Sequence, residues 1–192
     1  MLPTPDTSHI PPSVYPPSED SYLLLDVLSS THESAFLTAR FPHTTTPPPL
    51  LLEPGSGSGV LTAFLAAHAR QLLGRPDVLA LAADANPCAC GATRATVERA
   101  GAAAAGVFLG AVRADLAAAV RPRVVDVLVF NPPYVPTEGV PGFGPREGVE
   151  EGGLEREARM LELACAGGAD GMVVAGRMLE GLDGVLSERG VA

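Results

Sequence analysis

Apolar runs alternate with amphipathic stretches along the chain, and this pattern predicts strands and helices in turn. Continuous runs rich in Leu, Val and Ala, which are typical of buried parallel strands, occupy residues 50–53, 78–83, 106–112 and 124–130. Apolar residues at helical spacing occupy residues 18–29, 60–67, 87–100, 154–166 and 172–186. We therefore predict an α/β fold with a mostly parallel sheet flanked by helices, and with ligand groups at the carboxyl ends of the first four strands.

The fourth predicted strand, 124–130, stops at the sequence Asn131-Pro132-Pro133-Tyr134. Two consecutive prolines cannot donate ladder hydrogen bonds, so the strand has to end there. The segment offers the side-chain oxygen of Asn131 and several backbone carbonyls as acceptors, and the planar ring of Tyr134 follows at once. We interpret these four residues as a clamp for a flat NH2 group.

A glycine-rich turn joins the first strand to its helix, in the sequence Glu53-x-Gly55-x-Gly57-x-Gly59. Such a strand–turn–helix unit places backbone N–H groups at a helix N-terminus, where nucleotide-like ligands bind. The spacing differs from the G-x-G-x-x-G of dinucleotide sites, and the Gly-Lys-Ser/Thr of a P-loop is absent from it. Glu53 at the strand tip would repel a pyrophosphate, but it suits a ligand that carries an amino group and a sulfonium cation.

Acidic residues also follow the next two strands. Asp84 ends the second strand, where the carboxylate of a βαβ unit can accept from both hydroxyls of a ribose; a helix N-cap is an equal alternative for this residue. Asp115 and Leu116 follow the third strand. There the acid could accept from an adenine amino group while the leucine covers the ring, or Asp115 could be an ordinary loop residue.

The ends of the predicted elements suggest two further features. Residues 1–17 are rich in Pro, Thr and Ser, which predicts an extended arm ahead of a domain at 18–192. Glu19 and Asp20 begin the first helix, where both suit the positive end of the helix dipole. Residues 135–153 form a loop rich in Pro, Gly and Glu, which is either a substrate-facing lid or a solvated insertion.

Composition limits the partners. The chain has 192 residues, which suits one domain, and a formal net charge of −9, with arginine as its only formally cationic residue type. Proteins that wrap nucleic acid rely on a basic surface to displace counterions from phosphates. The acidic balance therefore counts against a nucleic acid partner.

The three cysteines, Cys88, Cys90 and Cys165, argue against a disulfide framework and for a reducing compartment. The Cys88-x-Cys90 spacing is too short for the usual zinc pairs, so we expect no metal site. Neither a secretory signal nor an apolar run of membrane-spanning length is found. We expect a soluble protein of the cytoplasm, with the nucleus as a second compartment, and no membrane partner.

The ordered set of motifs resembles a known family. The glycine-rich turn, Asp84, Asp115-Leu116 and Asn131-Pro132-Pro133-Tyr134 follow one another as in Rossmann-like class I methyltransferases that depend on S-adenosylmethionine and modify an amide or an exocyclic amine. Within that class, residues 15–26 and 128–135 resemble the eukaryotic and archaeal HemK-like glutamine methyltransferases, which modify the class 1 translation release factor. The resemblance extends from about Val14 to the end of the sequence.

The resemblance implies S-adenosylmethionine as the cofactor and S-adenosylhomocysteine as its product. Glu53 and Gly55 would contact the methionine part and amino group of the cofactor, Asp84 its ribose, and Asp115 with Leu116 its adenine. The implied cofactor-binding set is completed by Ser21, which would close over the methionine end, Gly57 and Asn131.

The implied catalytic residues are Asn131, Pro132, Pro133 and Tyr134. The Asn131 side-chain oxygen and the Pro132 carbonyl would accept the two hydrogen bonds of a glutamine amide, and Tyr134 would pack on the amide plane. No general base is required, because two acceptors that aim the nitrogen at the sulfonium methyl act through orientation and charge stabilisation. A single in-line displacement would give N5-methylglutamine in the Gly-Gly-Gln motif of the release factor.

The family also implies a partner, a small zinc-binding activator subunit that forms a heterodimer with the catalytic chain; its zinc would belong to the activator. The exposed edge of strand 106–112 is the expected contact, because an open strand edge can accept an added strand. The family's sheet has further strands beyond Ala192. We therefore expect the domain to be C-terminally incomplete, with only the start of a fifth strand at 191–192 and a fourth strand that lacks a neighbour on one side.

Three other functions are compatible with parts of this pattern. An Asn-Pro-Pro-Tyr clamp suits any planar NH2 group, so an adenine or cytosine amino-methyltransferase acting on DNA or RNA is the main alternative. A histone lysine methyltransferase is another, although a clamp lined with acceptors is a less natural fit for it. A non-catalytic scaffold that binds the cofactor is disfavoured by the intact clamp.

Overall fold

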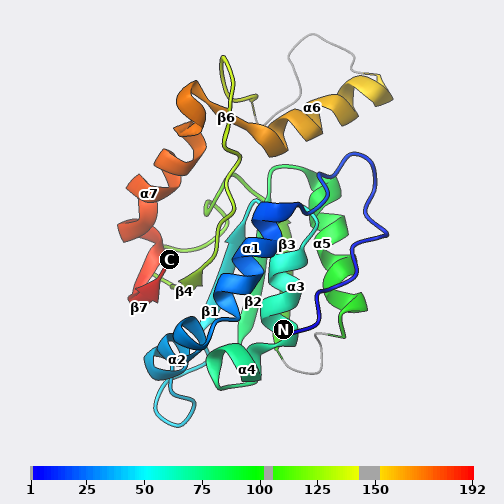
Figure 1. Cartoon of the computed structure of the whole chain (residues 1–192). Coiled ribbons are helices and arrows are strands. Elements are labelled where there is room, and N and C mark those ends of the chain that lie inside the picture. The colour runs from blue at the N-terminus through cyan, green and yellow to red at the C-terminus, as the bar shows by residue number, and fades with distance from the viewer. Residues whose placement is uncertain (1, 102–105, 143–151) are drawn as a thin grey trace.

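The computed structural model describes residues 2–101, 106–142 and 152–192. Within these ranges, five parallel strands form one sheet in the order β3-β2-β1-β4-β7 (Figure 1). The strands are β1 (Leu50–Pro54), β2 (Leu79–Asp84), β3 (Val107–Arg113), β4 (Val125–Leu128) and β7 (Leu186–Val191). This arrangement confirms the predicted α/β class with a parallel central sheet.

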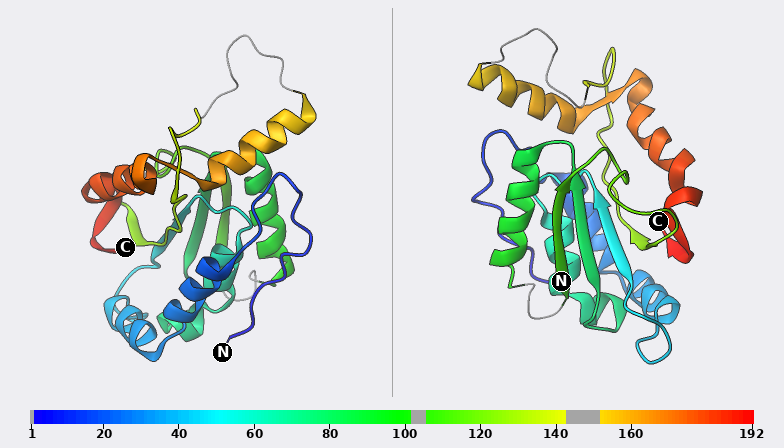
Figure 2. Two further views of the ribbon diagram at one scale, coloured as in Figure 1. Left: turned by 45° about the horizontal axis from the view of Figure 1, so that its top comes forward. Right: turned by 180° about the vertical axis from the view of Figure 1, so that it is seen from behind.

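Helices pack on both faces of the sheet. One face carries α1 (Glu19–Leu28), α2 (Thr31–Arg40), α3 (Val60–Ala67), α4 (Ala69–Leu73) and α5 (Pro87–Arg99), and the other carries α7 (Val173–Val185). Seen from behind, the strands lie in front of the first group of helices (Figure 2). Successive strand residues point to opposite faces, so Leu51 joins one core cluster and Leu52 the other. Because both faces of β1 pack against a core, its leucines form a continuous apolar run.

A smaller unit lies beyond the carboxyl ends of the strands (Figure 1). It contains β5 (Val135–Pro136), α6 (Gly153–Cys165), β6 (Ala166–Gly168) and a 3-10 turn (Ala169–Gly171), and β5 pairs in parallel with β6. Gly171 has φ +70°, and a Cβ at this position would lie 2.1 Å from the Tyr134 carbonyl oxygen. Only glycine therefore allows the turn to pack on the end of the clamp. Of the predicted loop 135–153, residues 143–151 lie outside the described residues.

Sequence analysis assigned no element to residues 31–40, where the structure has α2. The Ser30 side chain accepts a hydrogen bond from the backbone N–H of Glu33, 3.2 Å away, and so caps the helix. This Ser-x-x-Glu spacing is a helix-start signal that the apolar pattern alone does not reveal.

The expectation that the fourth strand lacks a neighbour is wrong, because β7 pairs with β4. The fifth strand begins at Leu186 rather than at 191. β7 contains Ser187, Glu188 and Arg189 in succession, and these polar residues break the apolar pattern by which a buried strand is recognised.

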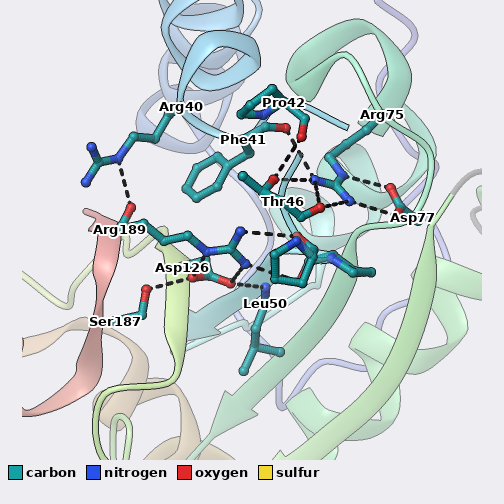
Figure 3. A network of polar contacts seen from close by, with 12 residues as sticks. Arg40, Phe41, Pro42, Thr46, Leu50, Arg75, Asp77, Asp126, Ser187 and Arg189 are labelled. Atoms are coloured by element: carbon teal, nitrogen blue, oxygen red, sulfur yellow. Dashed lines mark hydrogen bonds and ion pairs between the residues drawn. The ribbon is translucent and has the colours of Figure 1, made fainter. Parts of the chain in front are cut away.

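Ser187 and Arg189 of β7 are explained by Asp126, a buried acid of β4 (Figure 3). Asp126 accepts hydrogen bonds from the Ser187 hydroxyl at 2.6 Å and from Arg189 Nε and Nη2, both at 2.8 Å. It also accepts from the backbone N–H of Leu50 in β1 at 2.9 Å. Burial alone would raise the pKa of Asp126, but the hydrogen bonds from Arg189, Ser187 and Leu50 outweigh burial and lower it.

The N-terminal arm packs against α5. Val14 is buried with Ala89 and Ala92 of that helix, and the Asn86 side-chain amide donates to the Ser13 carbonyl at 2.8 Å. The division into an arm at 1–17 and a domain at 18–192 stays a prediction. Across the described ranges, no helix combines the length and the apolar character that a bilayer crossing requires.

We expect Asp126→Ala to lower the free energy of unfolding by about 3 kcal/mol, because Arg189 and two other donors lose their shared acceptor. Glu188→Ala is the matched control on the same strand; Glu188 is exposed, so the loss there should stay within about 0.5 kcal/mol. Urea unfolding followed by circular dichroism measures both. Equal losses in the two variants would contradict the role of Asp126.

Candidate functional site

A cavity of about 440 Å³ opens at the carboxyl ends of the strands. All eight residues predicted to bind the cofactor line it, namely Ser21, Glu53, Gly55, Gly57, Asp84, Asp115, Leu116 and Asn131. Pro133 of the clamp also lines it, whereas Pro132 and Tyr134 are not among the lining residues. The structure thus brings together groups from β1, β2, the end of β3, the end of β4 and α1.

The glycine turn after β1 has a backbone conformation that residues with a Cβ rarely adopt. Gly55, Gly57 and Gly59 have φ values of +63°, +51° and +77°. A Cβ on Gly59 would lie 2.4 Å from the Thr93 Cα of α5, so glycine there also permits the close packing of α3 on α5. Because Gly55 and Gly57 face the cavity, a ligand can approach the backbone at the start of α3 closely.

Glu53 is a buried acid in the cavity wall, with 2% of its surface exposed. Its Oε2 accepts from the backbone N–H of Thr62 at 2.8 Å and from the Thr62 hydroxyl. Burial raises the pKa of Glu53 to about 8; the hydrogen bonds from Thr62 oppose the rise, and the negative charge of Asp84 adds to it. A cationic group of a ligand placed against this wall would favour the ionised carboxylate.

Asp84 ends β2 and contacts the glycine turn. Its Oδ2 accepts from the Gly57 backbone N–H and its Oδ1 from the Asn86 backbone N–H, both at 2.8 Å. Burial raises the pKa of Asp84 against the effect of these two bonds. Each oxygen keeps a further lone pair, which is what accepting from two ribose hydroxyls requires. The N-cap alternative is wrong, because Asn86 caps α5 by accepting from the Cys88 N–H at 2.9 Å.

Asp115 and Leu116 follow β3 and lie in the cavity wall beside α7. Asp115 forms an ion pair with Arg177 of α7 at 2.5 Å, and both side chains are about half exposed, at 47% and 49%. Leu116 has φ +48° and packs against the core cluster under α7. Arg177 itself lines the cavity. Sequence analysis did not single it out, because an arginine on a helix carries no motif.

The clamp is tied to the first helix by Asp20. The Asp20 carboxylate accepts from the Tyr134 hydroxyl at 2.9 Å and from the Asn131 side-chain amide at 3.2 Å, both through Oδ2. Burial would raise the pKa of Asp20, but hydrogen bonds from Ser18, Tyr134, Asn131 and Ser21 lower it to about 2. Sequence analysis gave Asp20 only a helix-dipole role, since the separation in sequence hides this contact.

The outer wall of the cavity comes from α6, the start of α7, the described part of loop 135–153 and the N-terminal arm. The lining residues from α6, the start of α7 and the described part of loop 135–153 include Met160, Leu163, Val173 and Val140. The N-terminal arm adds Val14 to Pro17. The wall is therefore mostly apolar on this side, which suits the flat ring and the aliphatic parts of a nucleoside-like ligand.

The three cysteines are free thiols, and Cys88 is exposed. Within the part of the chain that the structure describes, no group of three or more His, Cys, Asp or Glu residues comes together in a way that could hold a metal ion.

Comparison with known proteins gives three informative relatives. Methyltransferase HEMK2 from Homo sapiens is 36% identical over 181 residues, which cover 93% of this chain and 69% of the human protein. The eRF1 methyltransferase catalytic subunit mtq2 from Schizosaccharomyces pombe is 32% identical over 198 residues, which cover 100% of this chain and 77% of that protein. The release factor glutamine methyltransferase from Moorella thermoacetica is 31% identical over 137 residues, 71% of this chain and 42% of that protein. No family model matches the chain.

The raised pKa of Glu53 predicts a pH dependence of stability. Glu53 stays protonated in the folded protein up to about pH 8, while in the unfolded chain it ionises near its ordinary value. Its contribution to stability is therefore full at pH 4 and falls as the pH rises to about 8, by about 1.4 kcal/mol per pH unit at most.

We expect Glu53→Gln to remove this dependence, since glutamine mimics the protonated acid. Urea unfolding of both proteins at pH 5 and pH 9, without cofactor, measures it. The wild type should lose stability relative to Glu53→Gln between the two pH values. Parallel pH profiles would show that Glu53 is already ionised in the folded state.

Proposed function

This chain belongs to the family of HEMK2 and eRF1 methyltransferase catalytic subunits, and from that premise we propose that it methylates the side-chain amide nitrogen of a glutamine. The substrate is the glutamine of the Gly-Gly-Gln motif in the class 1 release factor. Translation termination takes place in the cytoplasm, where we place the protein. The observation that carries the proposal is the shared cavity, in which buried acids meet Asn131 and Pro133 of the Asn-Pro-Pro-Tyr segment.

The walls of the cavity suit S-adenosylmethionine, which supplies an electrophilic methyl group on a sulfonium centre. Among the described residues, the donors to the Glu53 and Asp84 carboxyl groups in the cavity wall are neutral, and a cationic ligand would offset the cost of ionising these acids. Gly55 and Gly57 have no side chains, so the cofactor can lie close to the backbone of the turn. Leu116 offers an apolar surface for the adenine. Asp115 accepts from the adenine amino group.

The clamp orients the substrate rather than activating it by proton removal. An amide nitrogen is a poor nucleophile because its lone pair is delocalised into the carbonyl. Asn131 Oδ1 and the Pro132 carbonyl each accept one N–H of the glutamine amide and so fix the direction of the nitrogen. Holding two reactants in a reactive geometry is worth several kcal/mol of the barrier without any general base.

Incubating the chain with methyl-labelled cofactor and a release factor tests the substrate. We expect label on the release factor and none above background on its Gly-Gly-Gln variant with Gln→Ala. The reaction is run with and without the activator subunit. Equal label on the two release factors would refute the glutamine assignment, and label on DNA, RNA or histone added in its place would support the corresponding alternative.

We expect Asn131→Ala to retain cofactor affinity within about 2-fold and to reduce the rate of methyl transfer by about 100-fold or more, since one of two orienting acceptors is lost. Equilibrium dialysis with labelled S-adenosylhomocysteine measures the affinity, and initial rates measure the transfer. Loss of cofactor affinity in proportion to the rate would assign Asn131 a role in the cavity wall instead.

We also propose that a small zinc-binding activator subunit pairs with the free edge of β3. β3 is the terminal strand of the sheet, and it exposes the apolar side chains of Val107, Leu109 and Val112 by 51%, 53% and 36%. An unpaired strand edge with apolar side chains favours pairing with another chain. The zinc belongs to the activator.

Leu109→Asp should abolish co-purification with the activator, because it places a charge at the centre of the β3 edge. Leu179→Asp is the matched control: Leu179 is an apolar residue of α7 that is 61% exposed, and its replacement should leave the pairing intact. Both variants are compared by thermal unfolding to exclude a loss of fold. Undisturbed co-purification of Leu109→Asp would place the activator elsewhere.

A further inference from the structure

We propose that Asp20 is a positioning residue that fixes the direction of the Asn131 amide and the Tyr134 ring in the substrate clamp. This inference rests on the proposed function, and it adds to it a residue of α1 that carries no role in the family resemblance drawn from the sequence. The observation behind it is that one carboxylate oxygen, Asp20 Oδ2, accepts from both clamp side chains.

The contact decides which end of the Asn131 side chain faces the substrate. An amide carries an NH2 donor at one end and a carbonyl acceptor at the other, and the two ends have nearly the same shape. A carboxylate can only accept, so the NH2 end is drawn to Asp20 and the carbonyl end is turned away from it. Without Asp20, the amide could rotate and present a donor to the NH2 group of the substrate, whose delocalised lone pair is a poor hydrogen-bond acceptor.

The same carboxylate anchors Tyr134. This ring is 53% exposed, so packing alone constrains it weakly, and its hydroxyl donates to Asp20 at 2.9 Å. The hydrogen bond with Asp20 is the main cause that raises the pKa of Tyr134. On the other side, the turn at Gly171 packs against the Tyr134 carbonyl. Tyr134 is thus held at its hydroxyl by α1 and at its backbone by the turn before α7.

Asp20 is itself held in place before any substrate binds. Its Oδ1 accepts from the Ser18 hydroxyl and from the Ser21 backbone N–H, both at 2.6 Å. One carboxylate oxygen therefore contacts the start of α1, and the other contacts the clamp. Glu19, its neighbour, is exposed and belongs to the same first turn, so it shares the helix-dipole role but not the clamp contact.

A tyrosinate titration tests the contact without any substrate. The chain has 3 tyrosines and no tryptophan, so ultraviolet absorbance reports tyrosine ionisation cleanly. The Tyr134 component is obtained as the difference between the wild type and Tyr134→Phe. In the Asp20→Ala background, the same difference should shift to lower pH. An unchanged position would overturn the proposal, whatever the protein methylates.

Kinetics test the positioning role. Asp20→Ala should reduce kcat on the release factor by about 10- to 100-fold, the loss typical of a misplaced reacting group, with cofactor affinity unchanged within about 2-fold. Asp20→Asn should lose less, since its amide oxygen can still accept hydrogen bonds from the clamp. Glu19→Ala, the control for the helix dipole, should stay within about 2-fold of the wild type.

The outcomes separate the two proposals. An equal loss in Glu19→Ala and Asp20→Ala, or a loss of cofactor affinity in step with kcat, would overturn the positioning role. If the wild type itself leaves the release factor unmethylated, the proposed function fails, and the tyrosinate titration alone then decides whether Asp20 holds the clamp.

Discussion

The site depends on the position of β4, which pairs with β1 and β7 and is tied to both by the hydrogen bonds of one buried carboxylate. Asp126 joins the backbone of Leu50 in β1 to Ser187 and Arg189 in β7, with β4 between them. The main chain of β4 runs directly into Asn131, so a shift of this strand would move the clamp relative to the glycine turn of β1. A charged residue in a central strand is costly unless it is fully paired. Here its donors come from both neighbouring strands. Asp126 therefore also favours the order in which β1, β4 and β7 lie side by side.

Four acids that shape the sheet and the site fall into two groups, according to whether the protein itself supplies enough hydrogen-bond donors. Asp126 and Asp20 have lowered pKa values because hydrogen-bond donors of the protein outweigh their burial. Glu53 and Asp84 have raised pKa values because burial outweighs the few neutral donors around them. The first group is electrostatically complete within the chain. The second group faces the cavity, where positive charge from a ligand would complete it.

Much of the site could be predicted because its motifs follow the order of the strands. In a parallel sheet the carboxyl ends of all strands meet at one edge, so Glu53, Asp84, Asp115 and Asn131 had to converge once the strands were recognised. Their convergence on one cavity follows from topology. The glycine turn was predictable for a local reason, since closely spaced glycines favour left-handed backbone conformations.

The parts that sequence analysis missed depend on contacts between distant segments. β7 was hidden because its polar residues satisfy an acid in another strand, so the apolar period that marks a strand is broken by a partner some sixty residues away. Arg177 was hidden because its pairing with Asp115 depends on how α7 packs on the sheet. α2 was missed for a different reason, because its start signal is a cap rather than an apolar pattern.

The helix-dipole role predicted for Asp20 from its position in the sequence is physically sound and still incomplete. An acid in the first turn of a helix does favour the dipole, and Glu19 and Asp20 satisfy that rule equally. Only the fold distinguishes them, by placing the Asn131 amide and the Tyr134 hydroxyl next to one and not the other. The clamp is lined with acceptors, so it needs an internal acceptor to draw its own NH2 away from the substrate. A carboxylate meets this need better than a side-chain amide or hydroxyl, because it offers no hydrogen to donate in return.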